Sequence, residues 1–280
     1  MGTITVEDMR RWQLARLNVL LKTPPASKGP ESITIAVYHY WPDEIFDREF
    51  DYIEMSIRET WHHLGVLKVV LIINHLTPRI ERFCQAFPEW IKVDVCPELI
   101  SGNIYSMCRD AIGKLHQRID TDYVMYVHPD GWAIKPGIEP FVGKYDYIGA
   151  PFVPEHKNWV AKVLCLDLNM VGNGGFSLRS KKIFEMGSWY YKRKYKLIPN
   201  CFLLYEDIYF TRVLPSYEKR YRENIHIAPA DVAAEFALEG NVELYQKFGR
   251  KPLGFHTWRA FARLVSDGYI SMAGEGEGIQ

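Results

Sequence analysis

An alternation of short apolar segments and amphipathic segments constrains the fold of this chain more than any other feature. Apolar runs of four to eight residues predict strands, and the amphipathic stretches between them predict helices. Strands that alternate with helices form a mainly parallel sheet covered by helices, so the fold class is α/β. The expected strands are 33–37, 69–73, 91–95 and 123–127, and the expected helices are 53–64, 79–87 and one that begins at 101.

The second half of the chain is less regular, and it carries more loops. We expect a strand at 145–151, a glycine-broken strand at 171–178 and a short helix at 180–186. No internal repeat is present, and the glycine-rich end of the chain predicts a disordered tail at 266–280. The remainder, 31–265, is expected to be one domain.

Residues 5–22 predict a basic amphipathic helix, followed by a linker rich in proline that ends at residue 30. Such a helix can pack on the body of the protein or lie on a membrane surface. Packing is the favoured interpretation, because a basic helix on a globular domain usually presents a solvated charged face. Peripheral membrane contact through 5–22 remains the alternative.

Composition excludes several classes of protein. Lys+Arg and Asp+Glu both number 34, so no net charge attracts nucleic acid. The five cysteines are odd in number and form no CxxC pair, which argues against a disulfide framework and favours a reducing compartment. No signal-peptide pattern opens the sequence, and no apolar run approaches the roughly 20 residues of a spanning helix. We therefore expect a cytoplasmic protein.

The residues that follow the predicted strands are the first candidates for a binding site. In open α/β sheets, ligands bind in the crevice outside the carboxyl ends of the strands. The candidates are Tyr38 and His39, then Asn74, and then the run His128-Pro129-Asp130.

Asp130 follows an apolar strand and precedes Gly131, so its carboxylate is expected at an open edge of the sheet. Mg²⁺ and Mn²⁺ prefer oxygen ligands and commonly bind one or two carboxylates together with a substrate diphosphate. Asp130 could equally form an Asx turn with Gly131, and the sequence does not decide between the two.

The segment 172–179 contains three glycines in four positions and ends in Arg179. Gly174 and Gly175 would let backbone amides approach an anion or a sugar, and Arg179 could contact a phosphate. A tight hairpin is the alternative, and the spacing is not that of a P-loop.

Glu206 and Asp207 interrupt an apolar and aromatic run. Apolar surroundings raise the pKa of a carboxylate toward the range of a general base, and acids also stabilise a helix N-terminus, so both roles can hold together. His256 lies between aromatic residues further along the chain. A histidine in such surroundings is more often a structural residue than a ligand.

The order of these motifs resembles a glycosyltransferase-like family described as a domain of unknown function, and more broadly glycosyltransferases of the A fold. The resemblance rests on Tyr-Val-Met-Tyr-Val-His-Pro-Asp-Gly at 123–131, Tyr-Asp-Tyr-Ile-Gly-Ala-Pro at 145–151, Gly-Asn-Gly-Gly-Phe-Ser-Leu-Arg at 172–179, Glu-Asp at 206–207 and Gly-Phe-His at 254–256. It implies a single Rossmann-like domain with a mixed, mainly parallel sheet. Its nucleotide-binding half would be 31–135, and its acceptor and catalytic half 136–265.

The resemblance also implies a metal site. Asp130 matches the last acid of the Asp-x-Asp motif that binds a metal ion and the donor diphosphate. His128 stands where that motif has its first acid, and an imidazole ligand favours Mn²⁺ over Mg²⁺. His256 matches the late histidine that completes the metal site in many A-fold enzymes.

The resemblance assigns further roles to the other candidates. The segment 206–209 resembles the Glu-Asp-Val-Tyr segment of inverting β-1,3-galactosyltransferases, so Asp207 is implied as the base, with Glu206 beside it. Tyr38, His39 and Asn74 lie where the A fold binds the nucleotide base and ribose.

The function predicted from this resemblance is sugar transfer from a nucleotide-diphosphate sugar, with a UDP-sugar favoured, to a hydroxyl of a glycan or glycolipid acceptor. The expected outcome is inversion, and the expected cofactor is Mn²⁺ or Mg²⁺. A degenerate carbohydrate- or nucleotide-binding protein, a nucleotide-sugar hydrolase and a nucleotidyltransferase are the alternatives. Trp132, Phe152 and Trp159 would line the acceptor side or belong to the core.

Overall fold

The computed structural model describes residues 4–23, 28–65, 67–152, 171–198, 205–240 and 242–272. Trp159, Cys165, Cys201 and the tail residues 273–280 lie outside these ranges.

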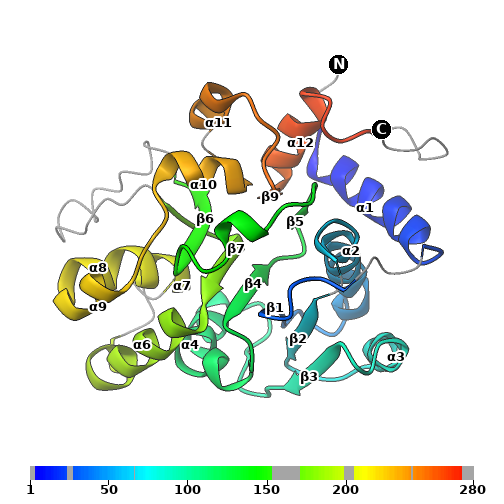
Figure 1. The fold of residues 1–280 in the computed structure, drawn as a ribbon. Coiled ribbons are helices and arrows are strands. Elements are labelled where there is room, and N and C mark those ends of the chain that lie inside the picture. The colour runs from blue at the N-terminus through cyan, green and yellow to red at the C-terminus, as the bar shows by residue number, and fades with distance from the viewer. Residues whose placement is uncertain are drawn as a thin grey trace.

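The described part of the chain contains a central sheet of six strands in the order β3-β2-β1-β4-β7-β6 (Figure 1). The first four strands in this order are parallel, and β7 is antiparallel to both of its neighbours. This architecture confirms the predicted α/β class with a mixed, mainly parallel sheet. The bounds are β1 Ile33–His39, β2 Lys68–Ile73, β3 Ile91–Val95, β4 Tyr123–Val127, β6 Tyr147–Pro151 and β7 Val171–Ser180.

A second, small sheet continues directly from the central one. Its order is β5-β9-β8, in which β5 pairs antiparallel with β9, and β9 pairs parallel with β8. Only three residues separate β4 from β5, so the connecting loop is held by a sheet at each end. The bounds are β5 Gly131–Ala133, β8 Ala237–Leu238 and β9 Gly254–His256.

Helices flank the central sheet, as the alternating pattern predicted. In Figure 1, α1, α2 and α12 lie together beside β5, and α10 lies next to β6. The bounds are α1 Val6–Leu20, α2 Phe46–Leu64, α3 Pro78–Ala86, α4 Ile104–Lys114, α6 Lys181–Tyr190, α7 Glu206–Ile208, α8 Leu214–Tyr217, α9 Lys219–Asn224, α10 Ala230–Phe236, α11 Val242–Phe248 and α12 Trp258–Ser266, with a π-helical turn at Tyr191–Tyr195 and another at Tyr209–Val213.

Strand β1 shows why the sheet forms the centre of the core. All seven of its residues are buried, as expected for a parallel strand that is covered on both faces. Helix α2 covers one of these faces with Phe50, Ile53 and Ile57, which are almost inaccessible to solvent. Burying a side chain of this size contributes about 1.5–3 kcal/mol, so these contacts fix α2 on the sheet.

Helix α1 packs against α2 and α12. Packing on the body of the protein was the favoured prediction for this helix. Leu17 is buried there, and Arg16 forms a buried ion pair with Glu59 of α2 at 3.0 Å. The indole of Trp12 stacks on that of Trp132 with 5.7 Å between ring centroids, and its Nε1 donates to the Ser271 carbonyl at 2.9 Å. The described residue Ser271, expected in the tail, therefore contacts the body. None of the described helices combines the length and apolar character needed to cross a bilayer.

Candidate functional site

Three of the predicted ligands converge at the carboxyl end of β4. His128 and Asp130 lie in the loop between β4 and β5, and His256 ends β9. One ligand atom of each lies within 4.8 Å of the others, which is a spacing that could hold a metal ion. The Nε2 of His256 is 3.1 Å from Oδ1 of Asp130, and the His128 and His256 rings are nearly perpendicular with 5.1 Å between centroids. We call these three residues the ligand cluster.

The pairing of β5 with β9 brings the ligand cluster together. Gly131 is opposite His256 in the antiparallel register, and the backbone N–H of Thr257 donates to the Asp130 carbonyl at 3.0 Å. A Cβ on Gly131 would lie 2.8 Å from the Phe255 carbonyl oxygen, so this close pairing requires glycine. Thr257 has a φ of 80°, a strained value for a residue with a side chain, immediately after a candidate ligand.

Gly174 and Gly175 lie directly against side chains of this chain, and their approach to an anion or a sugar stays a prediction. A Cβ on Gly175 would overlap the imidazole of His256. A Cβ on Gly174 would lie 2.6 Å from Nη2 of Arg179 and 2.7 Å from Oε1 of Glu206. The two glycines therefore leave space for functional side chains of this chain.

Replacing Gly175 with Ala is expected to displace the His256 imidazole and to weaken Mn²⁺ binding by about tenfold or more, because the ring loses its place beside Asp130. Titration calorimetry with Mn²⁺ measures the effect. The matched control is Gly113→Ala in α4, where the new Cβ would meet only ordinary contacts at 3.7 Å from the Tyr191 ring. Wild-type Mn²⁺ affinity in the Gly175→Ala variant would contradict the assignment.

The ligand cluster carries opposite charges on adjacent groups. Burial alone raises the pKa of Asp130, but the charge of His256 and its hydrogen bond outweigh burial and lower this pKa to about 2. Burial lowers the pKa of His256, yet Asp130 and Glu239 raise it well above its ordinary value. Burial and the charge of His256 lower the pKa of His128 to about 4, so its imidazole is neutral at pH 7. A metal ion would displace the proton of His256.

Glu239 was not predicted from the sequence. It follows β8, and its Oε2 lies 3.2 Å from Nδ1 of His256, on the opposite side of the ring from Asp130. A carboxylate behind a ligating histidine fixes the orientation of the ring and increases its basicity. No motif in the sequence points to this residue, since the contact depends on the pairing of β8 with β9.

Arg179 and Glu206 form a buried ion pair at 3.1 Å between Nη2 and Oε1. The Arg179 guanidinium also lies over the rings of Tyr126 and Tyr147, at 4.4 and 5.0 Å. The Cys108 thiol donates to Oε2 of Glu206 at 3.2 Å. In this structure Arg179 is therefore directed at Glu206 and not at an open phosphate site, and Glu206 is held in the core.

Asp207 differs from its neighbour Glu206, because it is partly exposed and has no cationic partner among the described contacts. Its Oδ1 accepts a hydrogen bond from the Ile208 N–H at 2.7 Å, at the start of α7. Burial and the negative charge of Glu206 raise the pKa of Asp207 to about 8. A carboxyl group with such a pKa is suited to accept a proton near neutral pH.

The segment Gly174-Gly175 connects Asp207 with the ligand cluster. A Cβ on Gly174 would lie 3.2 Å from Cβ of Asp207, and the next residue, Gly175, faces His256. The backbone N–H of His128 donates to the Gly175 carbonyl at 2.8 Å. The candidate base and the ligand cluster therefore lie against consecutive residues of β7.

The three residues expected to contact a nucleotide are not brought together with this cluster. Tyr38 and His39 are the last two residues of β1, which runs two residues further than predicted, and both side chains are buried. The Tyr38 hydroxyl donates to Asp110 at 2.8 Å, and the His39 ring packs on Phe46 with 3.9 Å between centroids. Both residues still stand at the carboxyl end of β1, and their contact with a nucleotide stays a prediction. Asn74 is partly exposed after β2, and its buried Oδ1 has no hydrogen-bond partner among the described residues.

Two aromatic residues expected at the acceptor side or in the core are buried. Trp132 is inaccessible to solvent and packs against Trp12, Phe255 and Phe261. Phe152 is 8% exposed, and the guanidinium of Arg212 lies 4.1 Å over its ring. Trp132 therefore belongs to the core and does not line an acceptor site in this structure.

Helix α1 forms a hydrogen bond to the loop that carries His128 and Asp130. The buried side chain of Gln13 donates to the Pro129 carbonyl at 2.7 Å, and Ser56 of α2 donates to the same oxygen at 3.0 Å. Pro129 lies between His128 and Asp130, so these two bonds fix the backbone of both candidate ligands. The sequence did not predict this contact, which joins residues 116 positions apart.

Residues 113–256, just over half of the chain, match the family described as "Protein of unknown function (DUF5672)". The chain belongs to the DUF5672 family. The DUF5672 segment contains the ligand cluster, Glu239 and Asp207, whereas α1 to β3 precede it.

None of the curated proteins matches the chain. Among solved structures, a glycosyltransferase involved in glycosylation of the major capsid of PBCV-1 shares 12% identity with a TM-score of 0.44, over 86% of this chain and 98% of that one. The apo form of the glycosyltransferase GlyE from Streptococcus pneumoniae shares 11% identity with a TM-score of 0.44, over 82% of this chain and 54% of GlyE. The mannosyltransferase Ktr4p from S. cerevisiae shares 9% identity with a TM-score of 0.44, over 83% of this chain and 79% of Ktr4p. These values are too low to transfer an activity, and the similarity to β-1,3-galactosyltransferases stays a prediction.

Proposed function

We propose that this DUF5672 protein is a glycosyltransferase that moves a sugar from a nucleotide-diphosphate sugar to an acceptor hydroxyl. The observation that carries the proposal is the position of Asp207, a carboxyl group with a raised pKa, beside the same glycine pair that faces the ligand cluster. The site lies at the carboxyl end of β4, where α/β sheets bind their ligands. The order of motifs in the sequence favours a UDP-sugar as donor and a glycan or glycolipid as acceptor.

The ligand cluster fits a divalent cation. Asp130 is 37% exposed and His256 16% exposed in their side chains, so both can be reached from solvent. Two imidazoles and one carboxylate suit Mn²⁺ better than Mg²⁺, which prefers oxygen ligands alone. When bound, the ion would neutralise negative charge on the leaving diphosphate.

Asp207 would act on the acceptor. Its carboxylate takes the proton of the acceptor hydroxyl, while the hydroxyl oxygen forms a bond to the anomeric carbon of the donor. The bond from that carbon to the nucleoside diphosphate breaks, and its electron pair leaves with the diphosphate. A single displacement of this kind inverts the configuration at the anomeric carbon. Glu206 stays paired with Arg179 and keeps the local negative charge that raises the pKa of Asp207.

The function is tested by incubating the protein with a panel of nucleotide sugars, with and without Mn²⁺ and with and without acceptors. A transferase releases nucleoside diphosphate faster when a suitable acceptor is present. Release that never depends on the acceptor would identify a nucleotide-sugar hydrolase. Binding without any release would identify a degenerate binding protein, and either result would reject the proposal.

The rate of transfer is expected to rise with pH and to level off above about 8, since Asp207 can accept a proton only when it is ionised. With a pKa of about 8, roughly a hundredth of the Asp207 carboxyl groups are ionised at pH 6. The measurement is kcat/KM from pH 6 to 9 at saturating Mn²⁺, with Mn²⁺ affinity determined across the same range as the control. A flat profile over this range would contradict the role of Asp207.

A further inference from the structure

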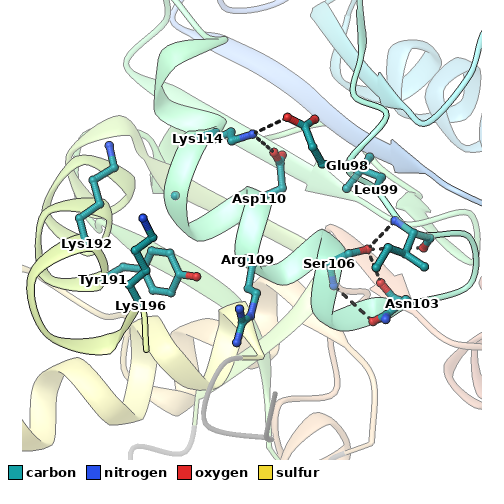
Figure 2. A pocket seen from close by; sticks show the side chains of 12 residues that line it. Glu98, Leu99, Asn103, Ser106, Arg109, Asp110, Lys114, Tyr191, Lys192 and Lys196 are labelled. Atoms are coloured by element: carbon teal, nitrogen blue, oxygen red, sulfur yellow. Dashed lines mark hydrogen bonds and ion pairs between the residues drawn. The ribbon is translucent and has the colours of Figure 1, made fainter. Parts of the chain in front are cut away.

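A cavity of about 470 Å³ is lined by none of the residues of the ligand cluster and not by Asp207. One wall is helix α4, and the other is the π-helical turn Tyr191–Tyr195 with the residues that follow it (Figure 2). The segment 98–100 closes one end. A volume of this size is typical of pockets that bind small molecules.

Basic side chains line both walls of this cavity. Lys192 comes from the turn and Lys196 directly follows it, and both lie beside Tyr191, whereas Arg109 and Lys114 come from α4 (Figure 2). Lys114 is partly neutralised, because its Nζ lies 3.4 Å from Glu98 and 3.9 Å from Asp110. Arg109 donates through Nη2 to the Ile198 carbonyl at 2.8 Å, but its buried Nε has no partner among the described residues.

The basic residues of the turn differ according to the direction they face. Arg193 and Lys194 do not line the cavity, and each has a partner. The Arg193 guanidinium lies 4.2 Å over the Trp189 ring, and Lys194 pairs with Glu218 at 2.7 Å. Lys192 and Lys196 do line the cavity, and neither forms an ion pair with a described residue. The uncompensated positive charge of this turn is therefore directed to the cavity.

Nearby negative charge does not cancel this charge. Of the two lining acids, Asp110 is buried and already bound by Arg118, and Glu98 lies beside Lys114. Lys192 and Lys196 are exposed at the rim, so they can move toward a ligand. The lining also includes the apolar side chain of Leu99 and the ring of Tyr191, which would contact the uncharged part of a ligand.

We propose that this cavity binds the phosphate group of a small phosphorylated ligand. Lys192 and Lys196 supply donors from one wall and Arg109 lines the other, which suits the three terminal oxygens of a phosphate better than the two of a carboxylate. Leu99 and Tyr191 supply a surface for a sugar or another ring attached to it. This site does not depend on the proposed sugar transfer, since it shares no residue with the ligand cluster or Asp207.

The test is titration calorimetry without metal at about 0.15 M salt, with inorganic phosphate and glucose 6-phosphate as the two probes. We expect saturable binding by the wild type, and a loss of affinity of about tenfold or more in the Lys192→Ala/Lys196→Ala variant. The matched control is Lys22→Ala/Lys219→Ala, which removes the same charge from exposed positions away from the cavity. Tighter binding of the sugar phosphate would assign the apolar wall to the sugar, and equal affinities would identify inorganic phosphate as a sufficient ligand.

A further variant separates this cavity from the candidate active site. Asp130→Asn should bind both probes with wild-type affinity, because Asp130 is not among the lining residues. The proposal is overturned if the wild type binds neither probe, if the control variant loses as much affinity as the Lys192→Ala/Lys196→Ala variant, or if Asp130→Asn abolishes binding.

Discussion

Replacing Asp207 with Asn is expected to slow sugar transfer by about 10²- to 10⁴-fold, which is the usual contribution of a general base. The amide cannot take the proton of the acceptor hydroxyl, although it can still accept the hydrogen bond from the Ile208 N–H. Donor and Mn²⁺ binding should therefore change little. Single-turnover transfer measures the chemical step, and calorimetry measures both binding events.

The chain offers a close control for this variant. Asp231 accepts a hydrogen bond from the N–H of Val232 at 2.9 Å near the start of α10, as Asp207 does from Ile208 at the start of α7. Asp231 is exposed and lies outside the candidate site. Asp231→Asn should transfer sugar at the wild-type rate. Equal losses in both variants would assign Asp207 to the helix start alone, and undiminished transfer by Asp207→Asn would remove it from the mechanism.

Replacing Asp130 with Asn is expected to weaken Mn²⁺ binding by about 100-fold and to reduce transfer in parallel. The change removes the single carboxylate of the ligand cluster and leaves His256 without its partner at 3.1 Å. Electron paramagnetic resonance of free Mn²⁺ gives the affinity directly. Nucleotide binding measured without metal should be the same in both proteins.

A second Asp–His contact supplies the control for Asp130. The Oδ1 of Asp43 lies 3.5 Å from Nε2 of His75, and the Asp43 carboxylate is 89% exposed. Asp43→Asn removes a similar contact from a place where no third ligand is found among the described residues, so Mn²⁺ affinity should remain that of the wild type. Unchanged affinity in Asp130→Asn would mean that the ligand cluster does not hold the ion.

Much of the fold could be predicted because its central strands are continuous apolar runs. The strands 91–95 and 123–127 have the predicted bounds. The error at β1 has a physical cause, since Tyr38 and His39 have polar atoms and resemble residues that leave a strand. Their backbones continue to pair with Ile72 and Ile73 of β2. The Tyr38 hydroxyl bonds Asp110 inside the protein, and the His39 ring packs on Phe46. The residue pattern of β1 alone does not show how far the neighbouring strand β2 extends, and β2 decides where β1 ends.

The candidate site was predictable where a residue leaves a strand or begins a helix. Asp130 and Asp207 have such positions, and both lie at the site. Gln13 and Glu239 were missed because each acts through a contact with a distant segment. The sequence predicts a phosphate ligand at Arg179 because it shows the charge of this residue and not the carboxylate that pairs with it.

Helix α1 lies outside the DUF5672 segment, yet its Gln13 bonds the carbonyl between two candidate ligands. A change in how α1 packs against α2 and α12 would move Gln13. Because Gln13 bonds the Pro129 carbonyl, such a change would shift the backbone beside Asp130 without any contact to Asp130 itself. A contact made from outside the DUF5672 segment therefore supports the backbone of two candidate ligands within it.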